Sequence, residues 1–196
     1  MKKMLLLTLL LLLSGCAAGG NIPNGQEELY TQKALGASQK VYTDVTQEQV
    51  LQAAEKILLL ADPEDTIVSQ RRDGISAKRE FFRYLILSAS TGTDYWTVAA
   101  KQTTSGIAVQ VAATAEQAYV LGPESGSRPV ADNSILEKDI IASEALYSLF
   151  YERLDYLLGK KKQWLDCSAA KDVMKKKQWL GDIDLLCGRG TSDARP

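Results

Sequence analysis

The chain has 196 residues, of which 23 are basic and 24 are acidic, and it contains no histidine. Its near-neutral formal charge of −1 argues against nucleic acid as the main partner, because nucleic-acid binding calls for a basic face. The missing histidine removes the commonest general base, the commonest metal ligand and every nucleophile that needs a histidine partner. Catalysis by two carboxylates stays open, but the acidic residues are scattered singly along the chain. We therefore expect no enzyme, no cofactor and no metal site.

The first fifteen residues are typical of an export signal. A positive end with two lysines is followed by a leucine run from Leu5 to Leu13, which only Thr8 interrupts. A permanent membrane-spanning helix needs about 20 apolar residues, so this run is too short to be one. We predict a signal peptide over residues 1–15 that is removed from the mature protein.

The signal ends in Leu13-Ser14-Gly15-Cys16, which resembles the lipobox of bacterial lipoproteins. The resemblance implies that Cys16 becomes the first residue and carries lipid, palmitate included, as a membrane anchor. Two or three acyl chains hold a protein on a membrane stably, whereas a single chain binds marginally. Because Ala17 and not Asp follows, the family's sorting rule implies the periplasmic face of the outer membrane in a Gram-negative source. The alternative is an ordinary secretory signal with a cysteine near its cleavage site.

Removal of residues 1–15 takes away two lysines, which leaves 21 basic and 24 acidic residues and a formal charge of −3. A mature chain of about 180 residues suits one domain with an appendage. Small and turn-forming residues from Ala17 to Gln26 predict a tether, and we assign residues 16–37 to the lipidated cysteine and this flexible tether. Gln39–Tyr42 is predicted as a short first strand.

A helix is predicted to follow, since Thr46 and Gln49 fit a capping box. Apolar residues then recur on one face at helical spacing as far as Ala61. Asp62-Pro63 ends the helix, because the residue before a proline avoids the helical region.

A meander of four antiparallel strands comes next. Turns are expected at Asp73-Gly74, Thr91-Gly92 and Ser105-Gly106, and connections this short force neighbouring strands to run antiparallel. The predicted strands cover residues 65–72, 75–89, 95–102 and 107–113, where apolar residues tend to alternate.

A long helix is predicted after a loop over residues 121–133. Ser134 and Glu137 fit a second capping box, and the helix should stop at Gly159. The expected inner face consists of Leu136, Ile140, Tyr147, Phe150, Leu154 and Leu158.

Together these elements predict an α+β fold with an antiparallel sheet of four to five strands and helices on one face. The domain should cover residues 38–159, and a helical appendage with a tail should cover residues 160–196. The order of strand, helix, four-strand meander and long helix resembles the helix-grip arrangement. That arrangement is found among envelope lipoproteins, such as the assembly-machine component BamC, and among lipid-binding domains. The resemblance concerns element order and does not assign a function.

Cys167 and Cys187 remain as a pair if Cys16 carries lipid, and export favours a disulfide between them. A straight helix would hold them about 30 Å apart, so the bond requires a chain reversal, for which Gly181-Asp182 is the natural place. We expect a helix from near Ser168 to Leu180, with the following residues folded back along it. Two buried free thiols are the alternative.

A six-residue repeat is the most unusual feature of the appendage. The sequence KKKQWL occurs at residues 160–165 and again at residues 175–180. On one continuous helix the two tryptophans would face nearly the same way, but a chain break near Cys167 would spoil that alignment. The candidate interaction surface consists of Lys160, Lys161, Lys162, Trp164, Lys175, Lys176, Lys177 and Trp179. It suits lipid headgroups or an acidic partner, whereas in the alternative the apolar residues dock on the domain and the lysines stay solvated.

The sequence therefore predicts a non-catalytic envelope lipoprotein that binds a protein partner as an accessory part of an assembly, secretion or transfer machine. The alternative is a periplasmic carrier that holds a lipid or a small apolar ligand between the long helix and the sheet.

Overall fold

The computed structural model describes residues 24–84, 88–121 and 139–187, together with the last residue, Pro196. The predicted signal peptide, the lipobox with Cys16 and the second capping box at Ser134 and Glu137 lie outside these residues. Among the described residues, no helix combines the length and the apolar character that crossing a membrane would require.

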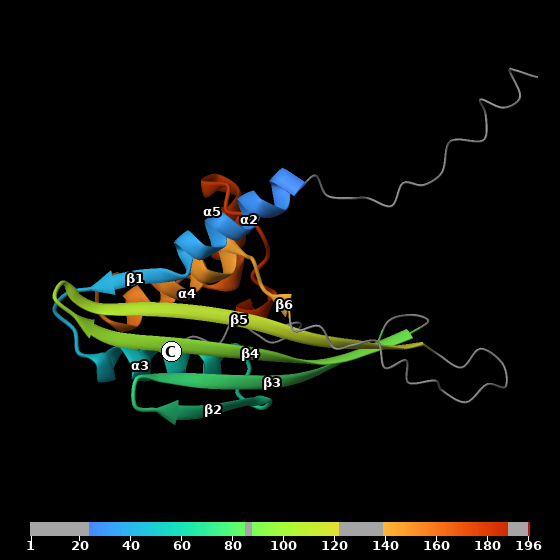
Figure 1. Ribbon diagram of the computed structural model, residues 1–196, viewed down its shortest axis with the longest axis horizontal. Helices are drawn as coiled ribbons and strands as arrows, with labels where there is room; N and C mark the ends of the chain where they lie inside the picture. Colours follow the sequence, from blue (N-terminus) through green and yellow to red (C-terminus); the bar gives the residue numbers. More distant parts are fainter. Residues whose placement is uncertain (1–23, 85–87, 122–138, 188–195) are drawn as a thin grey trace, which may run out of the picture.

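The sheet is antiparallel, with five strands in the spatial order β1-β5-β4-β3-β2 and a short strand β6 that also pairs with β5. This confirms the predicted α+β class (Figure 1). The predicted element order of strand, helix and four-strand meander is also present. The strands are β1 (Gln39–Tyr42), β2 (Thr66–Arg71), β3 (Gly74–Tyr84), β4 (Ser88–Thr103), β5 (Gly106–Leu121) and β6 (Asp139–Ile140).

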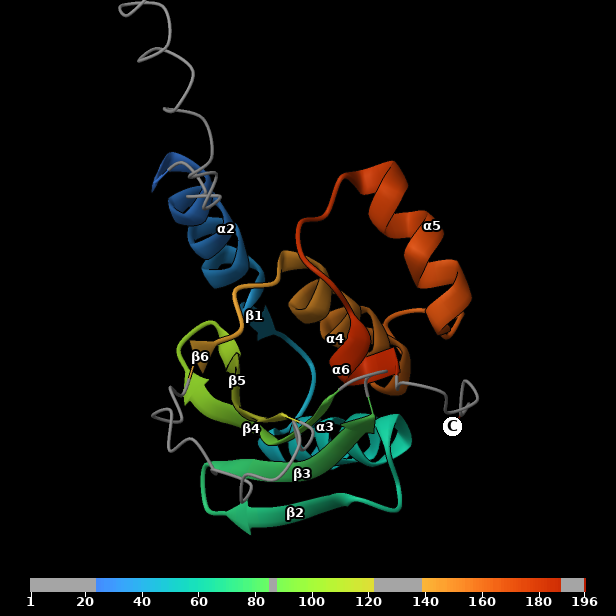
Figure 2. The same ribbon diagram turned by 90° about the vertical axis from the view of Figure 1, so that its right-hand side faces the viewer.

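The sheet curves around α3 (Gln47–Ala61), α4 (Glu144–Leu157) and the short α6 (Asp184–Cys187), which lie on one side of it (Figure 2). Alternate strand residues such as Ile75, Val98 and Val111 point toward these helices and are at most 2% exposed. Each such aliphatic side chain contributes about 1.5–3 kcal/mol by leaving water. The core therefore lies between one face of the sheet and the helical layer.

Helix α3 begins as its sequence predicts. The Thr46 side chain accepts a hydrogen bond from the backbone N–H of Gln49, and the Gln49 side chain accepts one from the backbone N–H of Thr46. Val50, Ala54 and Ile57 then lie on the buried face at 0% exposure. The helix ends at Ala61, next to Asp62-Pro63.

The prediction of a turn at Thr91-Gly92 is wrong. Gly92 lies inside β4, paired with Phe81 of β3 on one side and Gln117 of β5 on the other. A Cβ atom at Gly92 would come within 2.6 Å of the Phe81 ring and 2.2 Å of the Glu116 carbonyl oxygen. This glycine therefore allows close packing within a strand and does not make a turn.

The predicted start of the long helix is also wrong. Helix α4 begins at Glu144, where the Ser143 side chain accepts a hydrogen bond from the backbone N–H of Leu146. Ile140, expected on the inner helical face, belongs to β6 and is 74% exposed. The pairing of β6 with β5 holds this segment extended at the sheet edge.

The structure also differs from the predicted tether over residues 16–37. Residues Asn24–Ala37 form helix α2, which packs against α4 through the buried Ala34. The stretch from Glu27 to Ala37 is rich in Glu, Gln, Leu, Lys and Ala, which favour helix.

Two tyrosines of α4 form hydrogen bonds with the backbone of β5 and of the segments beside it. The Tyr151 hydroxyl shares its proton between the carbonyls of Ser38, at 2.8 Å, and Val109, at 3.0 Å. The Tyr147 hydroxyl donates to the Ile141 carbonyl and accepts from the backbone N–H of Ala113. Burial raises the pKa of both phenols, so both remain neutral donors around neutral pH.

A buried carboxylate joins α4 to β1. Asp155 is 5% exposed, and it accepts hydrogen bonds from the Lys40 ammonium at 2.7 Å and the Tyr42 hydroxyl at 2.9 Å. Burial, followed by the nearby Asp155 charge, raises the pKa of Tyr42 well above its usual range. A buried charge with two such partners fixes the relative position of the two elements.

Candidate interaction surface

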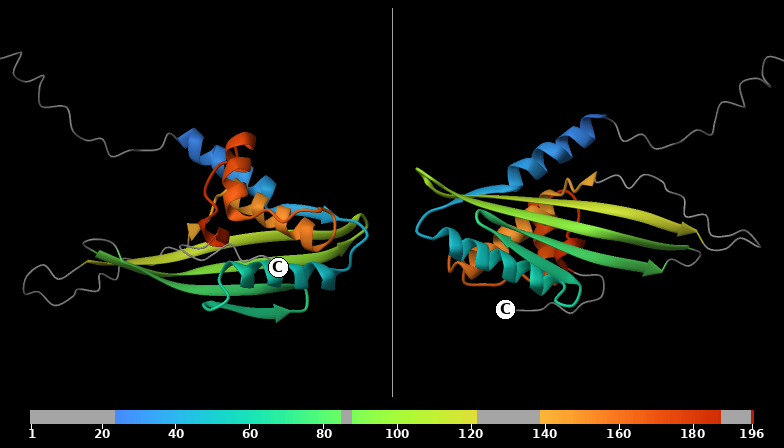
Figure 3. Two further views of the ribbon diagram at one scale, coloured as in Figure 1. Left: turned by 180° about the vertical axis from the view of Figure 1, so that it is seen from behind. Right: turned by 60° about the horizontal axis from the view of Figure 1, so that its bottom comes forward.

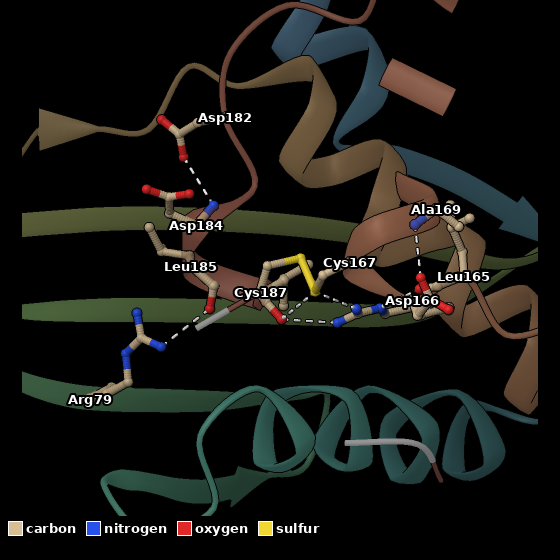
Figure 4. Close-up of a disulfide and its surroundings, with 11 residues drawn as sticks. Arg79, Leu165, Asp166, Cys167, Ala169, Asp182, Asp184, Leu185 and Cys187 are labelled. Atoms are coloured by element: carbon tan, nitrogen blue, oxygen red, sulfur yellow. Dashed lines mark hydrogen bonds between the residues drawn. A yellow bond between two sulfur atoms is a disulfide. The ribbon is translucent and has the colours of Figure 1, made fainter. Parts of the chain in front are cut away.

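The disulfide pair closes the C-terminal part of the fold (Figure 4). Cys167 opens helix α5 (Cys167–Lys177), and Cys187 ends α6, with 5.5 Å between their Cα atoms. Asp166 caps the first turn of α5. Beyond the end of this helix the chain reverses at Gly181, whose φ of +92° favours glycine. The sequence thus predicted both the pairing and the place of the reversal.

Arg153 of α4 holds this closed segment against the domain. Its side chain is 3% exposed and donates hydrogen bonds to the carbonyls of Leu165, at 3.1 Å, and Leu186, at 3.0 Å. A third donor lies 3.2 Å from the sulfur of Cys167. Arg79 of β3 donates a hydrogen bond to the Leu185 carbonyl of α6 and pairs with Asp94 at 2.7 Å. Two arginines thus dock the appendage on the domain.

The first copy of the repeat lies before α5 and is packed on α4. Trp164 is 8% exposed, with the Arg153 guanidinium 4.8 Å from its ring centroid and the Tyr156 ring edge-on at 5.7 Å. The Lys161 ammonium pairs with Glu152 and lies 3.7 Å from Asp155. Lys160 donates to the Thr43 carbonyl, and the Lys162 side chain is exposed.

The second copy lies at the end of α5. Lys175, Lys176 and Lys177 form its exposed last turn, and Gln178 then adopts a left-handed conformation that ends the helix. Trp179 is half-buried, with the Lys177 ammonium 4.9 Å from its ring centroid. Because Asp166 and Gln178 bound α5, the two tryptophans do not share one continuous helix.

Helix α2 contributes a pair of exposed leucines, which lie within the predicted tether. Leu29 is 45% exposed and Leu35 is 56% exposed, whereas Ala34 between them is 4% exposed. A helix that docks through an alanine and leaves both leucines open is unusual for a packed element. Each leucine lines a groove beside the helix.

Helix α2 leads into β1 at one edge of the sheet (Figure 3). The α2–β5 groove is lined by residues of this helix, of β5 and of the segment 140–142. It measures about 480 Å³, and its lining is mainly apolar. Its apolar lining includes Leu35 of α2, Val111 and Ala112 of β5, and Ile140 and Ile141. Leu35 and Ile140 are two of the most exposed large apolar side chains among the described residues.

The α2–α5 groove opens on the other side of α2 and measures about 640 Å³. Its apolar lining comes from Leu29, Met174, Trp179 and Leu180. Three lysines also line it, namely Lys33, Lys171 and Lys175. The second copy of the repeat therefore contributes to this groove, whereas the first copy does not line it.

The candidate residues thus fall into separate places. Of the eight residues predicted as one interaction surface, Lys175 and Trp179 line the α2–α5 groove, while Trp164 lies in the core cluster. Cys16 lies outside the described residues. No protein-family model matches the chain, and neither does any curated protein or solved structure. Its function is therefore inferred from its own sequence and geometry.

Proposed function

We propose that this protein is a membrane-anchored envelope lipoprotein that acts as a non-catalytic, protein-binding accessory subunit of an assembly, secretion or transfer machine. The lipobox at Leu13-Ser14-Gly15-Cys16 supports the anchor. The α2–β5 groove is the single observation that supports protein binding, because it keeps Leu35 and Ile140 open to water beside the sheet edge.

An apolar groove next to a sheet edge suits the apolar side chains of a partner segment. Burial of Leu35 and Ile140 in a complex would remove apolar surface from water at about 25 cal/mol per Å². Exposed apolar side chains that gather in one groove are typical of interaction sites, whereas scattered ones are normal on any surface.

The test is affinity purification of the full-length lipoprotein from gently solubilised membranes after crosslinking in cells. We expect one or a few envelope proteins to be recovered with the unchanged protein. The Cys16→Ala variant should lose them because the protein is no longer anchored. The double variant Leu35→Gln/Ile140→Gln should lose them while it stays in the membrane.

The matched control is Val41→Gln/Ile67→Gln, because these two side chains are 50% and 57% exposed and line neither groove. Equal recovery from the groove variant and the control would contradict protein binding at this groove. Reproducible recovery of no envelope protein would count against an accessory subunit altogether.

A carrier of lipid or a small apolar ligand is the second candidate. The core between α4 and the sheet is filled by side chains such as Phe150 and Trp96, so we place the ligand of this candidate function in the mainly apolar α2–β5 groove. The groove's volume of about 480 Å³ lies in the range of small-molecule sites. Native mass spectrometry of the mature chain, made without lipid as Cys16→Ser, distinguishes the candidates, because a copurifying lipid-sized mass favours the carrier and a bare polypeptide mass weakens it.

A further inference from the structure

The α2–α5 groove combines an apolar lining with a cationic rim. Leu29 of α2 faces Met174 and Trp179 across it. Lys171 and Lys175 lie one turn apart on α5, both exposed, and Lys33 lies on α2 one turn after Leu29. Among the described residues, no acidic side chain lines the groove.

The charges of the two α5 lysines are not neutralised by an acidic side chain of the described residues. Among the described residues, neither Lys171 nor Lys175 takes part in an ion pair, whereas Lys33 lies 3.7 Å from Glu144. Lys161 of the first repeat copy, by contrast, is paired with Glu152. The groove therefore presents net positive charge around an apolar surface.

The groove also follows the predicted anchor closely along the chain. Helices α2 and α5 project from the same side of the molecule (Figure 2). Asn24, where α2 begins, is eight residues after Cys16, a stretch that reaches at most about 28 Å when fully extended. Leu29 lies only about 7.5 Å further along the helix axis. A lipid on Cys16 would hold the groove within reach of the bilayer surface.

We propose that the α2–α5 groove binds the headgroups of anionic phospholipids in the bilayer that holds the lipid anchor. Trp179 and Leu29 enter the boundary between headgroups and acyl chains, where tryptophan is favoured, and Lys171 and Lys175 pair with phosphates. This inference rests on the proposed lipid anchor, and it adds which side of the domain faces the membrane. The α2–β5 groove, on the other side of α2, is left open for a protein partner.

The test is tryptophan quenching in the lipidated full-length protein, reconstituted in vesicles of phosphatidylethanolamine and phosphatidylglycerol with brominated acyl chains. Bromine quenches only tryptophans that reach the lipid. Trp96 and Trp164 are 5% and 8% exposed, so they supply an unquenched background. We expect quenching in the unchanged protein and its loss in Trp179→Phe.

The double variant Lys171→Gln/Lys175→Gln should lower the ratio of docked to undocked protein about thirtyfold, since each lysine near an anionic surface contributes about 1 kcal/mol. Its matched control is Lys56→Gln/Lys101→Gln, which removes two exposed lysines outside the groove and should leave quenching unchanged. Equal quenching in vesicles without phosphatidylglycerol would overturn the role of anionic headgroups.

Two results would overturn the inference in distinguishable ways. If the protein stays in the vesicles after washing but Trp179 is not quenched, the anchor stands and the groove does not dock. If the protein washes off and its mass shows no acyl chains, the anchor is refuted and the orientation falls with it.

Discussion

The two copies of KKKQWL have the same sequence and lie in different surroundings. In the first copy, Trp164 is enclosed by Arg153 and Tyr156, and Lys161 pairs with the carboxylate of Glu152 on α4. In the second copy, Trp179 is half-buried beside an open groove, and Lys175 lies on its rim without an ion pair among the described residues. The comparison teaches that one motif can stabilise a fold in one place and form a surface in another.

The local chain explains the difference. Residues 160–165 follow directly on α4, so the backbone N–H groups of Lys160 and Lys161 donate to the Asp155 carbonyl and the copy stays on its parent helix. Residues 175–180 end α5, where Ala170 is the buried residue. This copy also contacts α4, because Lys177 pairs with Glu152 at 3.4 Å and the Leu180 carbonyl accepts a hydrogen bond from the backbone N–H of Ala145. Lys175 and Trp179, however, line the α2–α5 groove. The surroundings, and not the six residues, decide which copy is buried.

The largest expected effect is on the first copy. Trp164→Ala should lower the free energy of unfolding by about 3–5 kcal/mol, because it opens a cavity and uncovers the buried Arg153 charge. Trp179→Ala should cost about 1–2 kcal/mol, since that ring is only half-buried. Urea unfolding of the mature chain, made without lipid as Cys16→Ser, measures both.

A conservative variant separates ring packing from hydrogen bonding at the same position. The Trp164 ring nitrogen is buried without a hydrogen-bond partner among the described residues. Trp164→Phe keeps much of the ring and removes this donor, so it should cost about 1.5 kcal/mol or less. Equal losses for the alanine variants at both tryptophans would refute the contrast between the two copies.

The second prediction concerns the disulfide, which closes a loop of residues 167–187 that contains only the second copy. Replacing both cysteines by alanine should lower the free energy of unfolding by about 3 kcal/mol, because the unfolded chain regains loop entropy. Below the unfolding transition, acrylamide should also quench more tryptophan fluorescence, and Trp179→Phe should abolish that increase. An increase that persists without Trp179 would mean that the disulfide also protects the first copy.

The sequence predicted those parts of the fold whose signals are complete within a few residues. The capping box of Thr46 and Gln49, the β2–β3 hairpin and the reversal at Gly181 all depend on neighbouring residues alone. The turn of this hairpin, Arg72-Asp73, lies one residue before the predicted Asp73-Gly74. Strand alternation likewise predicted the buried faces of β4 and β5, because one side of each strand packs on the helices.

The features that sequence reasoning missed depend on distant residues. The sequence predicts a turn at Gly92, because nothing near it in the chain shows that the Phe81 ring and the Glu116 carbonyl approach from both neighbouring strands. Helix α2 was assigned to a tether because its support comes from α4, about a hundred residues away. Both grooves of the candidate surface depend on α2, so neither was foreseeable once that helix was missed.

The smallest expected effect best distinguishes a lysine that stabilises the fold from a lysine that serves only the groove. Lys161→Gln should lower the free energy of unfolding by about 0.5–1 kcal/mol, since its ion pair with Glu152 is partly exposed. Lys175→Gln should change it by less than about 0.3 kcal/mol, because no ion pair is lost. Urea unfolding of the two variants, measured side by side with the unchanged chain, checks this order. If Lys175→Gln destabilises the protein as much as Lys161→Gln, then Lys175 supports the fold and its place on the groove is incidental. If it leaves stability unchanged while it weakens vesicle quenching of Trp179, then the lysine acts on the membrane surface and not on folding.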